Sequence, residues 1–323
     1  MKFAIVGAGA IGAFAGAMLA RAGEDVTLIA RGAHLRAMQE RGVRVRGEIG
    51  DFETHPAATD DPATVGPVDI VLLTLKAHSL TAMAPRLAPL IGPETLVVSA
   101  QNGIPWWYFY RHGGAWEGTH LETVDPGGVI SQSINPTQVI GCVIYPSTAI
   151  VEPGIVMHIE GTRFAIGEPD GSKSERCRRL ADSFIRAGLR CPIRTDIRHD
   201  MWVKLMGNVA YNPISALTRA TLIEIVRCPE TRAVAAAIMA EVESVAAQLS
   251  INIGVSIDQR LEGAEKVGHH KTSMLQDVEA GRPMEFESIV GAVVELGNKM
   301  ELPLPYTNAV YACVKLMAKS QKT

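Results

Sequence analysis

"KFAIVGAGAIGAFAGAMLARAGEDVTLIA", residues 2–30, decides the fold of the first half of the chain. Its opening run at 2–6 is short and apolar, which is typical of a strand buried in a parallel sheet. The small and apolar residues over 13–23 predict a helix, and a second buried strand follows at 25–30. A strand, a glycine-rich turn, a helix and another strand within about 30 residues are the setting of a dinucleotide-binding βαβ unit.

The turn between the first strand and the helix has the spacing G-x-G-x-x-G. Its first glycine permits a tight turn, the second lets the backbone approach a pyrophosphate, and the third lets the helix and strand pack closely. The N–H groups at the start of the helix then face the anion. We expect cofactor contacts from all six residues of the turn: Gly7, Ala8, Gly9, Ala10, Ile11 and Gly12. The alternative is a glycine-rich turn that holds no ligand.

The end of the second strand indicates which dinucleotide is bound. Enzymes that use NAD usually place an aspartate or glutamate there, against the hydroxyls of the adenosine ribose. This chain has Arg31 at that place, Arg36 nearby and no acid between them. A guanidinium can hold a 2′-phosphate through two hydrogen bonds, whereas a carboxylate would repel it. We therefore expect NADP(H); the alternative is an arginine that merely opens a surface helix.

Two further strands carry polar residues to the same edge of the predicted sheet. The strand predicted over 69–79 places Lys76 at its carboxyl end, and the strand over 95–103 does the same for Asn102. Ligands of parallel sheets bind beyond the carboxyl ends of the strands. Lys76 and Asn102 are therefore expected at the cofactor site.

The rest of the pattern predicts an α/β protein of two domains, because 323 residues exceed what one hydrophobic core usually covers. In the first half we expect crossover helices at 32–41 and 79–90, extended segments at 139–159, 163–167 and 191–195, and a helix at 173–187. In the second half we expect helices at 198–212, 230–250, 257–268, 273–280, 285–300 and 306–319, separated by prolines that include Pro213. The prediction is a Rossmann-like NADP-binding domain over 1–195, followed by an all-helical substrate and catalytic domain over 196–323.

The stretch "MWVKLMGNVAYNP", residues 201–213, opens this second half with an unusual pattern. Lys204, Asn208 and Asn212 are four residues apart, and steps of four advance a helical side chain by only about 40°. The three polar groups therefore share one narrow stripe of an otherwise apolar helix. Two interpretations are possible: a polar site, or a lysine that snorkels to solvent beside two surface asparagines.

Composition excludes several other classes of protein. A net charge of −3 provides no basic surface for nucleic acid. The five cysteines are scattered and form no CxxC, which favours a reducing compartment and speaks against structural zinc or any other metal. The apolar segment 233–251 contains Glu241 and Glu243, so it is not expected to span a membrane. We expect a cytoplasmic protein.

The chain resembles the ketopantoate reductases (2-dehydropantoate 2-reductases) over nearly its whole length. Besides the glycine turn, the shared motifs are "TLKA" at 74–77, "QNG" at 101–103, "W-x-K-L-x-x-N-x-x-x-N-P" at 202–213, "TSMLQD" at 272–277 and the acid of "MEFE" at 284–287. These motifs occur in the family's order, which makes the resemblance specific.

This resemblance implies a role for each polar residue. Lys204 would be the catalytic general acid, Asn208, Asn212 and Ser273 would hold the substrate, and Asn102 and Glu285 would lie at the nicotinamide end of the site. The residue types suit the chemistry, because reduction of a 2-oxo acid needs a proton donor beside the oxygen that becomes an alkoxide. The implied reaction is the NADPH-dependent reduction of 2-dehydropantoate to pantoate, in pantothenate biosynthesis.

Two departures from the family pattern leave the substrate open. The segment 104–137 is longer than the family pattern leads us to expect and begins "IPWWYFYRHGGAW". After Asn212, the turn at 218–225 lacks an asparagine that the family often places there. Trp106 and Trp107 either wall the substrate cleft or belong to the core or a subunit interface. The alternatives to ketopantoate reduction are a paralogue that reduces another 2-oxo acid and a non-catalytic NADP(H) sensor; in each case we expect a homodimer.

Overall fold

The computed structural model describes residues 1–320, which form two compact units. The sheet unit comprises Met1–Gln101, Trp106–His120 and Asp125–Ile197. The helical unit comprises Asn102–Pro105, Leu121–Val124 and the chain from Arg198 onward. After the strand β7 (Leu96–Ser99) of the large sheet, the chain therefore contributes two short segments to the helical unit before it crosses over at Arg198.

The sheet unit is built on seven strands in the order β11-β8-β7-β6-β1-β2-β5. The strands are β1 (Lys2–Val6), β2 (Asp25–Ile29), β5 (Ala57–Thr59), β6 (Ile70–Leu73), β7 (Leu96–Ser99), β8 (Val139–Ile144) and β11 (Phe164–Gly167). All neighbours pair in parallel except β11, which runs antiparallel to β8. β1 and β6 are buried along almost their whole length, as the continuous apolar runs predict.

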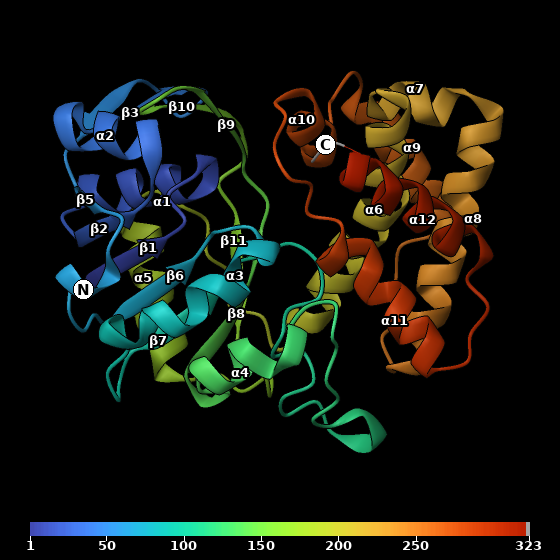
Figure 1. The fold of residues 1–323 in the computed structure, drawn as a ribbon, viewed down its shortest axis with the longest axis horizontal. Helices are drawn as coiled ribbons and strands as arrows, with labels where there is room; N and C mark the ends of the chain where they lie inside the picture. Colours follow the sequence, from blue (N-terminus) through green and yellow to red (C-terminus); the bar gives the residue numbers. More distant parts are fainter. Residues whose placement is uncertain (321–323) are drawn as a thin grey trace. The chain divides into compact units, whose positions relative to one another are not determined.

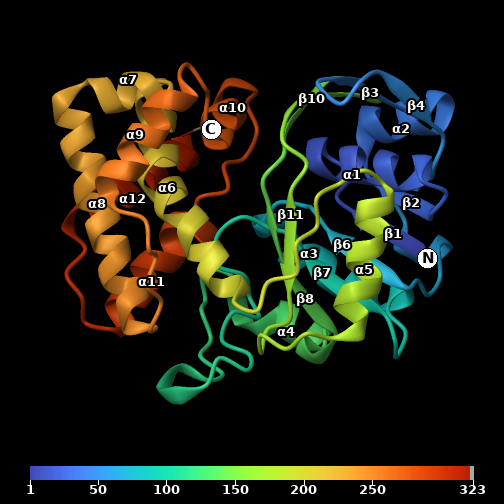
Figure 2. The same ribbon diagram turned by 180° about the vertical axis from the view of Figure 1, so that it is seen from behind.

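Helices cover both faces of this sheet (Figure 1). On one face α1 (Ala10–Arg21) and α5 (Glu175–Arg186) share a core with the strands, and Figure 2 shows α5 lying across them. On the other face the core contains α3 (Ala77–Met83), the 3₁₀ segment η2 (Ala84–Leu90) and α4 (Val129–Ser133). The helix α2 (Gly32–Arg41) follows β2. Short 3₁₀ turns complete the unit: Pro62–Thr64, Gly114–Trp116, Pro126–Gly128 and Pro136–Gln138.

A second, four-stranded sheet was not predicted. Its order is β4 (Phe52–Thr54), β3 (Val43–Gly47), β10 (Ile155–Glu160) and β9 (Ser147–Glu152), and it packs on α1. Val43 and Val45 are buried while Arg44 is exposed, so β3 has the period-2 alternation of a half-buried strand. The alternation is present in the sequence, but its pairing with β10, more than a hundred residues later, cannot be read locally.

The second unit is helical among its described residues. It contains α6 (Ile197–Thr218), α7 (Leu222–Arg227), α8 (Pro229–Gln248), α9 (Ile257–Val267), α10 (Ser273–Glu279), the π-helical turn η6 (Glu287–Gly291), α11 (Ala292–Lys299) and α12 (Pro305–Ser320). α7, α9, α11 and α12 all pack against α8, whose Ile238, Met239 and Val242 are fully buried. The predicted fold class, a Rossmann-like domain followed by a helical one, is confirmed.

Several predicted boundaries were wrong for identifiable reasons. α1 begins at Ala10 rather than at residue 13, so Gly12 lies in its first turn. The helix expected over 79–90 begins at Ala77, and its second part is a 3₁₀ segment in which Pro89 has no N–H to donate. Pro213 does not end α6, because buried residues on both sides of it favour continuation of the helix.

Two further segments of the helical unit also differ from the prediction. Thr221 begins the unpredicted helix α7, and its N–H and hydroxyl both donate to the Glu224 carboxylate, as in a capping box. The helix expected over 285–300 begins with the π-helical turn η6 instead of a regular turn. Within residues 1–320 no helix is both long enough and apolar enough to cross a membrane.

Candidate functional site

Packing alone explains two of the three glycines in the turn between β1 and α1. Gly7 has a φ of +93°, and a Cβ atom there would lie 2.4 Å from the backbone nitrogen of Leu75. A Cβ atom on Gly12 would lie 2.5 Å from the Gly7 carbonyl oxygen and 2.5 Å from the Thr74 hydroxyl. Any larger residue at either position would collide with the neighbouring βα loop, so both glycines are needed for the fold itself.

Gly9 differs, because within residues 1–320 only one atom comes within 4 Å of a Cβ atom placed there. Its φ is −75°, which any residue adopts, and a Cβ atom there would approach only the Gly7 carbonyl oxygen, at 3.9 Å. Gly9 is exposed and is the N-cap of α1, and no side chain of the described residues caps this helix. Because Gly9 is the N-cap, the open space is at the end of α1 whose first N–H groups have no partner within the helix, and this end fits a pyrophosphate.

Cations flank this turn. Arg31 is exposed and is the N-cap of α2, directly beyond β2, and Arg36 is exposed on the same helix. Lys76 is half-buried and is the N-cap of α3; it follows Leu75, which packs beneath Gly7. Neither α1, α2 nor α3 has an acidic residue in its first turn. The electrostatic setting therefore favours a polyphosphate ligand.

Sequence reasoning missed His34, which lies next to the glycine turn. Its Nδ1 accepts a hydrogen bond of 2.9 Å from the Gly154 N–H at the β9–β10 turn. Burial lowers the pKa of the His34 ring, and the backbone of Ala8 opposes part of that lowering. The His34 ring therefore joins α2 to the small sheet through its Nδ1 acceptor. In the stretch "RGAHLR" at 31–36, the arginines indicate phosphate binding, whereas no local pattern marks the histidine.

On α6 the polar stripe lies beside a buried apolar face. Trp202, Met206 and Val209 are fully buried. Lys204 and Asn208 are half-buried and Asn212 is 5% exposed. The helical spacing thus brings the three polar residues to one side of α6, with their stems in the protein. A lysine that simply snorkels to bulk solvent does not fit the contacts that Lys204 makes.

Lys204 is the first residue of a short hydrogen-bonded chain inside the helical unit. Its Nζ donates to the Oδ1 of Asn102 at 2.8 Å, and the Nδ2 of Asn102 donates to the Glu285 carboxylate at 3.3 Å. Asn102 is the first residue of the segment Asn102–Pro105 that the loop after β7 contributes to the helical unit. An amide has one accepting and one donating end, so the carboxylate and the ammonium orient it together. The structure therefore brings together Lys204, Asn102 and Glu285.

The other residues expected to bind the substrate are Asn208, Asn212 and Ser273. Ser273 is the exposed first residue of α10, and its neighbour Thr272 provides the helix cap by accepting from the Leu275 N–H at 3.2 Å. Within residues 1–320, no hydrogen bond joins Ser273, Asn208 or Asn212 to the Lys204–Asn102–Glu285 chain. Their role in substrate binding stays a prediction.

The aromatic segment after Asn102 belongs mainly to the core of the sheet unit. Trp107 is 1% exposed, and a Cβ atom on Gly141 of β8 would lie 2.7 Å from its ring. Trp106 is half-buried and packs against the core formed by α3, η2 and α4. The hypothesis that Trp107 walls a substrate cleft is therefore wrong, because its indole fills the space that Gly141 leaves open.

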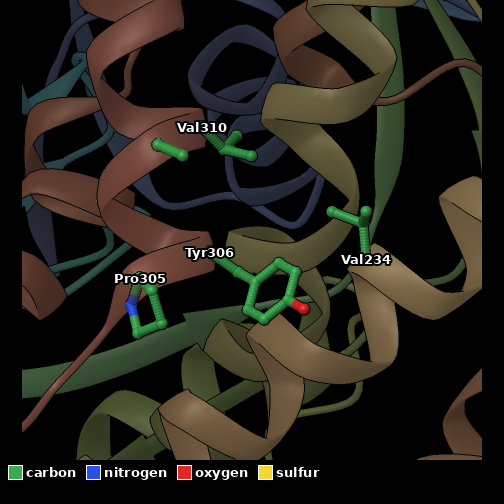
Figure 3. Close-up of a pocket in the computed structure, with 5 residues that line it drawn as sticks. Val234, Pro305, Tyr306 and Val310 are labelled. Carbon is green, nitrogen blue, oxygen red and sulfur yellow. The ribbon is translucent and has the colours of Figure 1, made fainter.

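A shallow apolar groove of about 380 Å³ on the helical unit is not the candidate site. It is lined by Val234 of α8 and by Pro305, Tyr306, Ala309 and Val310 of α12 (Figure 3). None of the residues expected to bind cofactor or substrate is among them. No cluster of three or more histidine, cysteine, aspartate or glutamate side chains in residues 1–320 is arranged to hold a metal ion.

Two family descriptions match the chain. "Ketopantoate reductase PanE/ApbA" matches residues 3–171, and "Ketopantoate reductase PanE/ApbA C terminal" matches residues 196–318. A 2-dehydropantoate 2-reductase of Mesorhizobium japonicum is 49% identical over 320 residues, which cover 98% of each chain. One of Pyrococcus horikoshii is 30% identical, over 98% of this chain and 97% of that one.

Solved structures agree with these matches. A crystal structure from Ralstonia solanacearum, described as that of a putative ketopantoate reductase, matches with a TM-score of 0.94 at 40% identity. The match covers 99% of this chain and 98% of the Ralstonia chain. A Rossmann-like unit with a dinucleotide turn, followed by a helical unit, defines a dinucleotide-dependent oxidoreductase. The two family matches and the close relatives then specify the group: the chain belongs to the ketopantoate reductase family.

Proposed function

We propose that the protein catalyses the NADPH-dependent reduction of a 2-oxo acid to a 2-hydroxy acid, with 2-dehydropantoate as substrate and pantoate as product. The observation that carries this proposal is the ordered chain from the Lys204 ammonium through Asn102 to Glu285. It supplies a positioned proton donor, which carbonyl reduction requires. The 49% identical relative, named as a 2-dehydropantoate 2-reductase, supports the choice of substrate and a place in pantothenate biosynthesis.

The residues of the sheet unit would hold the cofactor. The residues from Gly7 to Gly12 bind its pyrophosphate at the start of α1, and Gly9 leaves the space for it. The guanidinium of Arg31 binds the 2′-phosphate and thereby selects NADPH over NADH. Lys76 adds positive charge beside the same turn. When bound, NADPH supplies the hydride that the substrate carbonyl carbon receives.

The residues of the helical unit carry out the remaining chemistry. Lys204 holds a proton at Nζ and donates it to the substrate oxygen as negative charge develops there. Asn102 keeps the ammonium in place, and Glu285 fixes which end of that amide faces the lysine. Asn208 and Asn212 bind the hydroxyl groups of the substrate, and Ser273 at the start of α10 binds its carboxylate.

Two alternatives lead to different results. A paralogue would use the same chemistry on another 2-oxo acid, which the differences at 104–137 and 218–225 would allow. A sensor would bind NADP(H) without turnover, but it would have no use for the ordered Lys204. Steady-state oxidation of NADPH across a panel of 2-oxo acids distinguishes them. A kcat/KM highest for 2-dehydropantoate supports the proposal, a different best substrate supports the paralogue, and tight NADPH binding without turnover supports the sensor.

We also propose that the protein is a cytoplasmic homodimer. Twofold dimers are the commonest soluble oligomers, and a biosynthetic reductase uses the cytoplasmic NADPH pool. Trp107, Tyr108 and Phe109 are buried within one chain and therefore do not provide a subunit interface. Sedimentation equilibrium of the full chain tests the dimer; a single species with the 34.7 kDa mass of one chain would contradict it.

A further inference from the structure

The loop that carries Asn102 is held by one residue of the π-helical turn η6, Ser288. The Ser288 hydroxyl donates to the Asn102 carbonyl oxygen at 3.1 Å. The Ser288 carbonyl oxygen accepts from the Ile104 N–H at 2.8 Å. The intervening Gly103 has a φ of +88°, and a Cβ atom there would lie 2.1 Å from the same carbonyl oxygen. Ser288 therefore contacts the loop on both sides of Gly103.

The π-helical register makes the second of these contacts possible. In an α-helix the Ala292 N–H would donate to the Ser288 carbonyl four residues earlier. Here it donates instead to the Glu287 carbonyl, five residues earlier. The Ser288 carbonyl is left without its usual partner in the helix, and the Ile104 N–H satisfies it. Because of the wider turn, the Ser288 carbonyl is thus available to bind the 102–104 loop.

The same turn lies directly after Glu285. Glu285 holds the side chain of Asn102 while Ser288, three residues later, holds its backbone. Because Ser288 is only 3% exposed, its position is set by the packing of the helical unit. The Asn102 amide is thereby fixed at both its backbone and its side chain, with Oδ1 directed at the Lys204 Nζ.

We propose that Ser288 is a positioning residue for catalysis: through its two contacts with the 102–104 loop it orients Asn102, and through Asn102 it aligns the Lys204 ammonium. This inference rests on the proposed function. On this proposal, η6 holds the hydrogen-bonded series Lys204–Asn102–Glu285 in one geometry. The π-helical turn is then a functional feature of the fold, as such turns often are.

A double-mutant cycle tests the proposal. Ser288→Ala should lower kcat about fivefold, the effect of one lost hydrogen bond, and leave the KM and the NADPH Kd unchanged. In an Asn102→Ala background the same substitution should cost less than about twofold, because its route to Lys204 is already broken. The solvent deuterium isotope effect on kcat should increase in Ser288→Ala, because proton transfer slows relative to the other steps.

Two further variants separate positioning from stability. Ser288→Thr keeps the hydroxyl and should restore kcat, although its extra methyl group lowers the melting temperature. Thr231→Val is the matched control, since the Thr231 hydroxyl also donates to a backbone carbonyl of the helical unit, that of Ile225, at 2.6 Å. It should lower the melting temperature and leave kcat unchanged.

The outcomes that overturn the inference are distinct. A wild-type kcat in Ser288→Ala would overturn it and leave the proposed function standing. So would an equal loss of kcat in the wild-type and Asn102→Ala backgrounds, which would show that Ser288 acts independently of Asn102. If the wild-type protein turned over none of the 2-oxo acids, the proposed function would fail, and this inference would fail with it.

Discussion

Replacing Gly9 by alanine tests whether the turn after β1 is shaped for a ligand rather than for packing. Because a Cβ atom at Gly9 meets only one atom, at 3.9 Å, and the φ is −75°, the stability of the variant should stay within about 1 kcal/mol of wild type. Gly12→Ala should instead destabilise the protein by about 1–3 kcal/mol, because its Cβ atom would lie 2.5 Å from two other atoms.

NADPH affinity should change in the opposite order, with a larger loss in Gly9→Ala than in Gly12→Ala. The methyl group of Gly9→Ala would occupy the space in which the pyrophosphate approaches the N–H groups of α1. Loss of one hydrogen bond to a charged group corresponds to a Kd about 10- to 100-fold higher. Urea unfolding measures stability, and fluorescence titration with NADPH measures affinity on the same samples.

A control variant and two contrary results complete this test. Gly263→Ala is at a helical glycine of α9, where no atom of residues 1–320 lies within 4 Å of an added Cβ, and it should leave NADPH affinity unchanged and slightly raise stability. If Gly9→Ala bound NADPH as wild type does, the turn would not approach the phosphates. A loss of stability as large as that of Gly12→Ala would show that Gly9, too, is required for packing.

Two other predictions concern the sheet unit. Arg31→Ala should raise the Kd for NADPH about 10- to 100-fold, as expected for a lost hydrogen bond to phosphate. The Kd for NADH should stay nearly unchanged. If fluorescence titration showed equal losses of affinity for both cofactors, Arg31 would not recognise the 2′-phosphate. Because the pKa of His34 is lowered in the folded protein, the unfolded chain binds a proton there at a higher pH than the folded protein does. The contribution of neutral His34 to stability is therefore fully present above the ordinary pKa of 6.5, and it is lost as the pH falls toward the folded pKa. The melting temperature of His34→Gln should therefore decrease less with acid than that of wild type, and parallel curves would contradict this.

The local features of the fold were predictable from the sequence, whereas features made by distant pairing were not. β1, the glycine turn and β2 lie within 30 residues, and each signal there concerns neighbours in the chain. β3 joins residues 43–47 to β10 at 155–160, and no local pattern specifies that partner. The local effect of Pro213 predicts a helix end, but the burial of the surrounding residues outweighs that effect.

The candidate site shows the same division. The spacing of Lys204, Asn208 and Asn212 predicted a common stripe because helical periodicity is local. The contact of Lys204 with Asn102 joins residues a hundred positions apart, and only the resemblance to a family brought both into one site. Ser288 could not be found from sequence, since its carbonyl is available only through the π-helical register and the presence of Ile104.

The central claim is that Lys204 donates the proton in the reduction of a 2-oxo acid. Its most direct test is the kcat of Lys204→Ala with 2-dehydropantoate, measured by NADPH oxidation alongside the NADPH Kd. We expect kcat to fall by about 10²–10⁴, the usual range for a lost general acid, while the Kd for NADPH remains as in wild type. A kcat within a few-fold of wild type together with a raised KM would contradict the claim, because Lys204 would then bind the substrate and another group would supply the proton.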